Sequence, residues 1–439
     1  MSDLSAPEDS SPPLPSRRTL IAGAAWSVPA IVAMSVSPAS AKSNQTVLAF
    51  DKASYAGTTC STITGATVTA TLNGTPQIGV NVTVSLTGGF TFSGGATSST
   101  GQTDGNGVYA VPSITVPNQP TSSTATATAS GANPSSSTLE AKGTFAHFLT
   151  IRNISVESDM VFDRIPSTAV PVGGYGVFLD GTTLWYGNAV FATGVRDARG
   201  NRNDTTDFFS YIENGVAKSA YGSNGSVTAI RTWNNVPGSA TPVGGFGTFL
   251  DNRNLWYFDT IVASGVRDAM ALSGGMNGPA QGQWTDYVGF FNNAARSFKG
   301  VNGTPADWQG FFNVPSSAAV TRMPNLWLNS NGDLWYGDLR RTTRVTAASG
   351  ALRSNADDGT IVWAAPPPGA MDVSGYVANN FRTFPSTPAS ATPVGGEGVF
   401  LAGNDLWVNN RKVLSNIAHA VSDGGPNGYI HITYSTNGC

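Results

Sequence analysis

The sequence predicts an all-β protein, a β-sandwich followed by a β-propeller built from four imperfect repeats of about 72 residues. Three observations predict this class. A Pro-Val-Gly-Gly…Trp motif recurs along the C-terminal two thirds of the chain. Short apolar runs alternate with polar residues and turn signals, and no stretch shows helical periodicity. Charged residues are only 12% of the chain and 51 of its 439 residues are glycine, as is typical of extracellular β proteins.

The charge balance excludes one class of partner. The formal net charge is −3, so the chain lacks the basic field that nucleic-acid binding needs. We interpret a small basic cluster, Arg340, Arg341 and Arg344, as a solvated turn or strand edge. We therefore expect no nucleic-acid partner.

Residues 1–41 have the order of an export signal. Arg17 and Arg18 precede the apolar run AGAAWSVPAIVAMSV, and a small-x-small pattern follows it. This order predicts cleavage between Ala41 and Lys42. The paired arginines resemble a twin-arginine export signal, although the basic residue usual after the apolar pair is missing.

The expected location is therefore outside the cell, either free or associated with the cell surface. The alternative is an uncleaved membrane anchor, but the apolar run is short for a span of roughly 20 residues. After cleavage we expect no membrane association. The two cysteines, Cys60 and Cys439, predict one internal disulfide in an exported protein. Two free thiols and an intermolecular bridge are the alternatives.

Residues 42–145 are predicted to form an Ig-like β-sandwich, because strand signals recur about every ten residues with turns between them. Strands are expected at Ala66–Leu72 and Val80–Leu86, and a turn at Thr103–Gly107. The layout TVTATLNGTPQIGVNVTVSLTGG…TDGNGVYAVPSITV resembles bacterial Ig-like domains of the invasin/intimin type. That resemblance implies a spacer or adhesive module. Asp104 is interpreted as a turn residue, with a calcium ligand as the alternative.

Residues 146–439 carry the repeats. A tryptophan recurs in every copy, at Trp185, Trp256, Trp335 and Trp407. Successive tryptophans are 71, 79 and 72 residues apart. In three copies a Pro-Val-Gly-Gly motif begins fourteen residues before the tryptophan, at Pro171, Pro242 and Pro393. The copy at Val314–Asp338 lacks this motif. Sheets repeated radially in this way form a propeller, with four large blades or more if each repeat splits in two.

The two ends of the repeat region predict how the ring closes. The last copy lacks its final strand, and an equivalent segment precedes the first copy at residues 160–170. Supplying the missing strand from the N-terminal side would remove exposed sheet edges.

The repeats also carry a family resemblance. The motif NGDLWYGD and the GVRDA element after it resemble propeller repeats of the regulator-of-chromosome-condensation and tectonin types. The family's glycine-rich basic positions and histidine positions are mostly absent, so the resemblance implies no nucleotide-exchange role.

The tryptophans Trp185, Trp256, Trp335 and Trp407 have two interpretations. Both faces of a blade pack against neighbouring blades, so the four rings are expected to belong to the core between blades. The alternative is a ring of aromatic platforms on which sugars stack.

No motif predicts catalysis. The three histidines, His147, His419 and His431, are far apart, and no metal-binding spacing is present. Two acid pairs lie in loop-like sequence and are interpreted as turn or solvated residues: Asp204 with Asp207, and Asp357 with Asp358. Asp197 and Asp268 recur in GVRDA, which favours a structural role. We therefore expect no catalytic residue, no cofactor and no metal.

The favoured function is a secreted, non-catalytic binding or adhesion protein whose propeller loops recognise a glycan or a surface protein. It rests on the absence of catalytic motifs and on the similarity of the repeats, since an active site usually breaks a repeat. The alternatives are an exported polysaccharide hydrolase or lyase, and a structural surface protein without a discrete ligand. We expect a monomer, with the ligand recognised by the segments that do not repeat, 270–285, 296–307 and 340–380.

Overall fold

The computed structural model describes residues 45–203, 205–274, 285–301, 303–352, 358–374, 377–424 and 429–438. Within these ranges every regular element is a β-strand except one 3-10 turn at Ser93–Gly95, so the predicted all-β class is confirmed. The chain divides into two units at Gln45, and the second unit, Thr46–Cys439, is compact. The expected export signal, with Arg17, Arg18, Ala41 and Lys42, lies outside the described residues.

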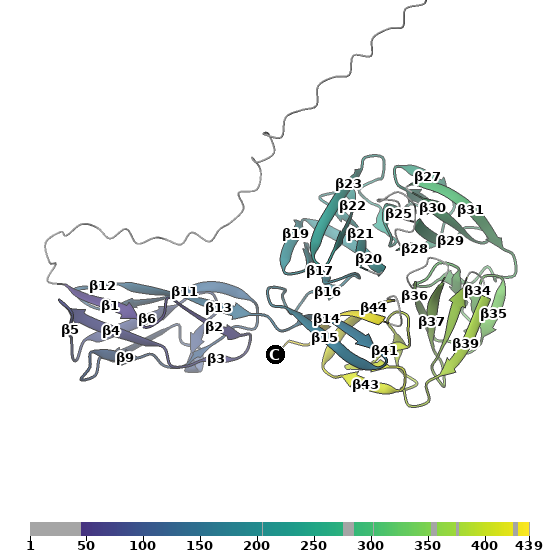
Figure 1. The fold of residues 1–439 in the computed structure, drawn as a ribbon. Coiled ribbons are helices and arrows are strands. Elements are labelled where there is room, and N and C mark those ends of the chain that lie inside the picture. Colours follow the sequence, from purple (N-terminus) through teal and green to yellow (C-terminus); the bar gives the residue numbers. More distant parts are fainter. Residues whose placement is uncertain are drawn as a thin grey trace, which may run out of the picture. The chain divides into compact units, whose positions relative to one another are not determined.

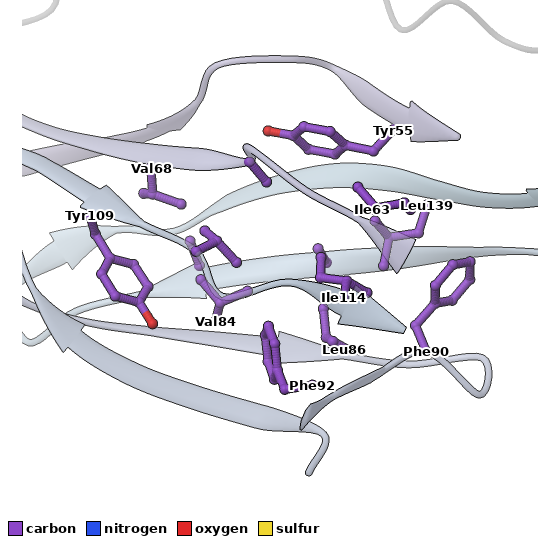
Figure 2. Packing of buried hydrophobic residues seen from close by; sticks show 14 of the residues in the cluster. Tyr55, Ile63, Val68, Val84, Leu86, Phe90, Phe92, Tyr109, Ile114 and Leu139 are labelled. Atoms are coloured by element: carbon purple, nitrogen blue, oxygen red, sulfur yellow. The ribbon is translucent and has the colours of Figure 1, made fainter. Parts of the chain in front are cut away.

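The first part of the second unit contains three sheets around one apolar core (Figure 2). The first has the order β12 (Ala132–Asn133), β1 (Thr46–Phe50), β4 (Thr67–Leu72) and β5 (Thr75–Pro76), with β9 (Val108–Ala110) paired to β4. The second has the order β2 (Ser54–Thr58), β13 (Ser135–Lys142), β11 (Thr121–Thr128), β6 (Asn81–Leu86) and β8 (Ser98–Gln102). The small third sheet contains β3 (Thr62–Ile63), β10 (Ile114–Thr115) and β7 (Thr91–Phe92).

This core follows from the period-2 pattern of its strands. In β6 every second residue is buried, and Val82 and Val84 are fully buried. The predicted strands begin within one residue of β4 and β6. Asp104 also behaves as predicted, because its Oδ1 accepts the backbone N–H groups of Asn106 and Val108, each at 2.9 Å, within the turn.

The described residues of the second part form eight four-stranded antiparallel sheets, arranged around a centre in the manner of a propeller (Figure 1). Each sequence repeat contains one short sheet, which carries the recurrent tryptophan, and one long sheet follows it; the last long sheet takes two of its strands from the N-terminal side of the repeats. The first short sheet contains β16 (Val170–Pro171), β17 (Val177–Asp180), β18 (Thr183–Tyr186) and β19 (Ala189–Thr193). The second contains β24 (Thr241–Pro242), β25 (Thr248–Asp251), β26 (Asn254–Tyr257) and β27 (Thr260–Ala263), and the third contains β32 (Ala319–Val320), β33 (Leu326–Leu328), β34 (Leu334–Tyr336) and β35 (Leu339–Thr342). The fourth contains β40 (Thr392–Pro393), β41 (Val399–Ala402), β42 (Asp405–Val408) and β43 (Arg411–Leu414).

The long sheets alternate with the short ones. They are β20 (Val195–Asn203), β21 (Thr206–Glu213), β22 (Val216–Ser223) and β23 (Ser226–Trp233); β28 (Asp268–Gly274), β29 (Thr285–Phe291), β30 (Ala295–Val301) and β31 (Thr304–Phe311); β36 (Ala347–Leu352), β37 (Asp358–Ala364), β38 (Gly369–Ser374) and β39 (Val377–Thr383); and β44 (Ile417–Gly424), β45 (Tyr429–Thr436), β14 (Ala146–Arg152) and β15 (Ser155–Phe162).

The last long sheet joins the two ends of the repeat region. Strand β14 pairs with β45 in antiparallel register from Ala146 opposite Ser435 to Arg152 opposite Tyr429. The N-terminal side thus supplies two strands, β14 and β15, where the sequence predicts one. The first strands of the long sheets approach one another at the centre, where β20 contacts β28 and β44, and β44 contacts β36 (Figure 1).

Candidate ligand-binding site at the centre of the sheets

The Pro-Val-Gly-Gly loops attach each short sheet to the first strand of the next long sheet. In each complete copy the valine carbonyl accepts a backbone N–H from that strand at 2.9 to 3.0 Å, in the pairs Val172 with Gly200, Val243 with Ala271 and Val394 with Ser422. The first glycine follows this valine. A Cβ atom there would lie within 2.0 to 2.3 Å of a backbone oxygen of the same strand, at Gly173, Gly244 and Gly395. Close contact between loop and strand therefore requires glycine at this position.

The copy in the third short sheet breaks this rule. Arg322 stands where the other copies have the first glycine, and Met323 where they have the second. Among the described residues, no hydrogen bond joins Thr321 to Gly350 in the way that Val243 is joined to Ala271. The Met323 side chain instead packs on β36, because a Cβ at Gly350 would lie 2.6 Å from its Sδ. The centre is therefore not symmetric. This differs from the expectation that the repeats are alike, on which the predicted non-catalytic function partly rests.

A cavity of about 480 Å³ lies beside this altered loop, within the usual size range of small-molecule sites. We call it the central cavity; its lining residues are Arg199, Asp268, Ala269, Met270, Ala319, Val320, Thr321, Arg322, Leu328, Ala347 and Ala348. A second cavity of about 20 Å³, room for one water molecule, shares Arg199, Met270 and Arg322 with it and extends to Ser349 and Asp423. The two cavities draw on strands β20, β28, β36 and β44 of all four long sheets.

Arg322 extends across the centre from the 321–325 loop. Its Nη1 donates a hydrogen bond to the carbonyl oxygen of Val394 at 3.2 Å. Burial lowers the pKa of Arg322, the nearby charge of Arg199 lowers it further, and Asp423 opposes both effects. The guanidinium remains charged, because arginine does not deprotonate in proteins at ordinary pH.

Arg199 lies on β20 and lines both cavities. Burial lowers its pKa, and Asp197 opposes this effect. Its guanidinium donates no hydrogen bond to any residue that the structure describes. Two positive side chains thus face the same space, and one of them lacks a hydrogen-bonded partner among the described residues.

Asp423 is the buried acid of this group. Its Oδ2 accepts the backbone N–H of Gly174 at 3.0 Å. Burial raises the pKa of Asp423 to about 6, while Arg322 lowers it and Asp207 raises it. Lowering the pH through 6 therefore removes a negative charge from the neighbourhood of Arg322.

One of the aspartates that were interpreted as turn or solvated residues is instead a buried acceptor between two sheets. Asp207 lies on β21, fully buried, so the interpretation as a turn or solvated residue is wrong. It accepts hydrogen bonds from the Tyr186 hydroxyl at 2.6 Å and from Arg202 at 2.9 Å. Asp286 accepts the Tyr257 hydroxyl at 2.6 Å in the next repeat. These pairs join a short sheet to the long sheet after it. Asp204, Asp357 and the side chain of Asp358 lie outside the described residues.

The four motif tryptophans lie away from the central cavity, and none of them lines it. Each is half-buried and packs at the edge of an apolar cluster between two sheets, at Trp185, Trp256, Trp335 and Trp407. Their indole N–H groups are buried without a hydrogen-bond partner among the described residues. The packing agrees with the core interpretation, and sugar stacking on these rings stays a prediction.

The remaining candidates divide between described and undescribed residues. Cys60 is exposed, whereas Cys439 lies outside the described residues, so their pairing stays a prediction. Arg340 is exposed and forms an ion pair with Asp333 at 3.6 Å. His431 stacks on Phe148, and burial lowers its pKa to about 4. In the described part of the chain no group of three His, Cys, Asp or Glu side chains could hold a metal ion.

Sequence reasoning missed both central arginines. The available signal was a comparison of equivalent positions, at which Arg322 replaces glycine and Arg199 replaces the Met270 of the next repeat. No helix among the described residues is long and apolar enough to cross a membrane.

No protein-family model matches the chain, and no curated protein matches it. Solved structures similar to it include the N-terminal part of BBS1 in a complex with ARL6, with 8% identity and a TM-score of 0.30 over 67% of this chain and 92% of that one. They also include the SapL1 lectin in complex with alpha methyl fucoside, with 14% identity and a TM-score of 0.23 over 61% of this chain and 90% of that one. At these TM-scores neither likeness supports a conclusion about ligand or activity.

Proposed function

We propose that the chain is an exported binding protein, with an Ig-like sandwich at residues 42–145 and a propeller at residues 146–439, and that it recognises a glycan through the centre of the propeller. One observation carries this proposal. The repeat that departs from the others does so at the centre, where Arg322 replaces a packing glycine and a cavity of about 480 Å³ lies beside it.

The lining of the cavity and the altered loop beside it support binding. It combines apolar walls, including Met270 and Leu328, with the polar groups of Arg199 and Thr321. Such a mixture suits a sugar, whose C–H faces pack on apolar side chains while its hydroxyls take directional hydrogen bonds. The third copy also lacks the hydrogen bond between loop and strand that accompanies glycine in the other copies, and a long charged side chain occupies the position.

A surface protein is the other expected ligand, and the binding experiment below distinguishes it from a glycan. We propose export through the twin-arginine-like signal, with cleavage between Ala41 and Lys42, as the route by which the chain meets either ligand. The resemblance to invasin/intimin-type domains, which are spacers or adhesive modules, supports an adhesive role.

One observation favours a second candidate, a polysaccharide hydrolase or lyase. Asp268 lines the central cavity and Asp423 the small one, and burial raises the pKa of both carboxyl groups. A raised pKa is what a general acid needs. A glycosidase also requires its two carboxyls on opposite sides of one glycosidic bond.

A glycan array probed with the exported chain tests the proposal, followed by incubation of each bound glycan with a reducing-end assay. Binding without release of reducing ends supports a binding protein. Release that is lost in both Asp268→Asn and Asp423→Asn would replace it with the hydrolase. Absence of binding to any glycan, with capture of a purified surface protein, would move the ligand class to protein, and absence of both would leave a structural role.

A further inference from the structure

We propose that the central cavity holds an anionic oxygen group of the ligand, a carboxylate or a sulfate ester on a sugar, between Arg199 and Arg322. This inference deepens the proposed function and rests on it for the identification of the ligand as a glycan. The acid group itself is inferred from the side chains that line the cavity.

The first step is the number of donors left for a ligand. A guanidinium carries five N–H donors. Among the described residues, Arg322 uses one of them, towards the Val394 carbonyl, and Arg199 uses none. Most donors of both side chains are therefore available, although burial has removed part of their water. Both side chains are half-buried, and none of their nitrogens is among the fully buried atoms without a partner, so water meets these donors in the free protein and the oxygens of a ligand can replace it.

The second step is the charge balance of the cavity. Three carboxylates lie near the two arginines, and the two that line the cavities each accept one backbone N–H, while Asp268 Oδ1 has no hydrogen-bond partner among the described residues. Asp423 accepts the Gly174 N–H at 3.0 Å. Asp268 accepts the Val320 N–H at 3.2 Å and lies 3.8 Å from the Arg267 guanidinium, outside the cavity. The charge of Asp197 acts on Arg199 and raises its pKa, against the effect of burial.

The third step is the cost of the arrangement. Arg199 and Arg322 are close enough that the charge of one acts on the other. Like charges brought together and partly desolvated destabilise a fold unless a partner compensates them. The other repeats show that the fold does not need either arginine, because glycine and Met270 stand at the equivalent positions. Sites that hold such charges together are commonly functional sites.

The geometry of arginine then selects the ligand group. The planar guanidinium fork matches the spacing of carboxylate, sulfate and phosphate oxygens and binds them through paired hydrogen bonds. A long polyanion is disfavoured, because the net charge of the whole chain is −3 and no extended basic surface surrounds the cavity. A single acidic group on an otherwise neutral sugar surface fits both observations.

Calorimetry with the full exported chain tests the proposal with three matched probes. These are a uronate trisaccharide, the same trisaccharide with its carboxyls methyl-esterified, and a neutral trisaccharide that carries one sulfate ester. The methyl ester removes the charge while it preserves the sugar. The uronate and sulfate arms distinguish the two sources of the anionic group. Inorganic sulfate, scored by its effect on the melting temperature, reports the anion site without a sugar.

Four variants accompany the wild type. Arg199→Met introduces the residue found at the equivalent position of β28, and Arg322→Met removes the second charge. Arg322→Lys keeps the charge and removes the fork. Arg411→Met is the matched control, since Arg411 is an exposed arginine on β43, away from the cavity. The melting temperature of each variant confirms that it is folded.

We expect one acidic trisaccharide to bind the wild type at least about 10-fold more tightly than its uncharged counterpart, with a loss of about 10- to 100-fold in each Met variant. Arg322→Lys should lose less, and Arg411→Met nothing. Equal binding of acidic and esterified probes, retained in the Met variants, would overturn the inference and leave the proposed function intact. If no trisaccharide binds but sulfate stabilises the wild type and not the Met variants, the anion site stands and the glycan function falls. If sulfate also has no effect, both fall.

Discussion

Arg322 donates a hydrogen bond from Nη1 to the carbonyl oxygen of Val394, 3.2 Å away and 72 residues further along the chain. The two residues belong to equivalent loops of two short sheets. Val394 keeps the hydrogen bond to Ser422 that the intact motif makes, and it accepts the arginine as well. The third repeat therefore lacks the contact between loop and strand that the fourth repeat retains. The Arg322 side chain of the third repeat contacts the loop of the fourth.

Arg322→Met should leave the free energy of unfolding unchanged or raise it by about 1 kcal/mol, because it removes a partly desolvated charge next to Arg199. The lost hydrogen bond to Val394 offsets part of this gain. Thermal unfolding of the wild type and the variant at pH 7 measures the difference. A fall of more than about 2 kcal/mol would show that Arg322 is kept for stability, not for binding.

Gly244→Ala should destabilise the fold by about 3 kcal/mol or more. The added Cβ would lie 2.3 Å from the Ala271 oxygen, and the residue has a φ of 105°. Gly181→Ala is the matched control, because it has a φ of 54° and open space around its Cβ position. We expect it to cost about 1–2 kcal/mol, the backbone strain alone. Equal losses in denaturant unfolding would contradict the steric account of the motif.

The contributions of Asp286 and Asp423 to stability should fall as the pH rises from about 4 to 7, while buried His431, whose pKa is lowered to about 4, acts in the opposite direction. Burial raises the pKa of Asp286 to about 7 and that of Asp423 to about 6, both above the unfolded value of 3.8. The folded state therefore binds more protons in this window, and the contribution is fully present below pH 4 and lost above 7. For Asp286 the loss is of the order of 4 kcal/mol.

Asp286→Asn isolates this effect, because the other titrating groups are common to both proteins. Melting temperatures measured between pH 4.5 and 7.5 should fall in the wild type and fall distinctly less in the variant. Parallel curves for the two proteins would mean that Asp286 is ionised throughout, held by the hydroxyls of Tyr257 and Ser273.

The mature protein should begin at Lys42 and contain one Cys60–Cys439 disulfide. Gly438 lies beside Ser167, and Gln119 donates a hydrogen bond to the Ser167 hydroxyl at 2.8 Å, which places Gly438 near the segment that contains Pro117 and Gln119. Cys60 donates its backbone N–H to Pro117 at 3.2 Å. Intact mass with and without reduction measures both features. Two alkylated thiols in the unreduced protein, or a disulfide-linked dimer, would support one of the alternatives.

Much of the architecture could be predicted, because it repeats. The spacing of Trp185, Trp256, Trp335 and Trp407 located every short sheet, and the truncated last copy predicted where the ends of the ring meet. The number of sheets could not be predicted, since four or five strand signals per repeat fit one large sheet as well as two small ones. Only the pairing between strands separated them, with β19 ending one sheet and β20 beginning the next.

The candidate site was hidden for a different reason. Asp207 lies among Gly, Asn and Thr residues that read as a loop, yet it is buried because Tyr186 and Arg202 supply donors from outside its own strand. Arg322 lies in the copy that lacks the Pro-Val-Gly-Gly motif. The loss of a motif has no sequence pattern of its own that would indicate a functional residue.

The sequence by itself determined the all-β class, the positions of the motif-bearing strands and the closure of the ring, because alternation, turn residues and repetition act over short distances along the chain. Only the tertiary structure decided which residues meet at the centre. Arg199, Arg322 and Asp423 come from three different repeats, and their proximity depends on the curvature of eight sheets around a common axis. The repeated residues build the sheets, and a single departure from the repeat, glycine to arginine, places charge where the sheets converge.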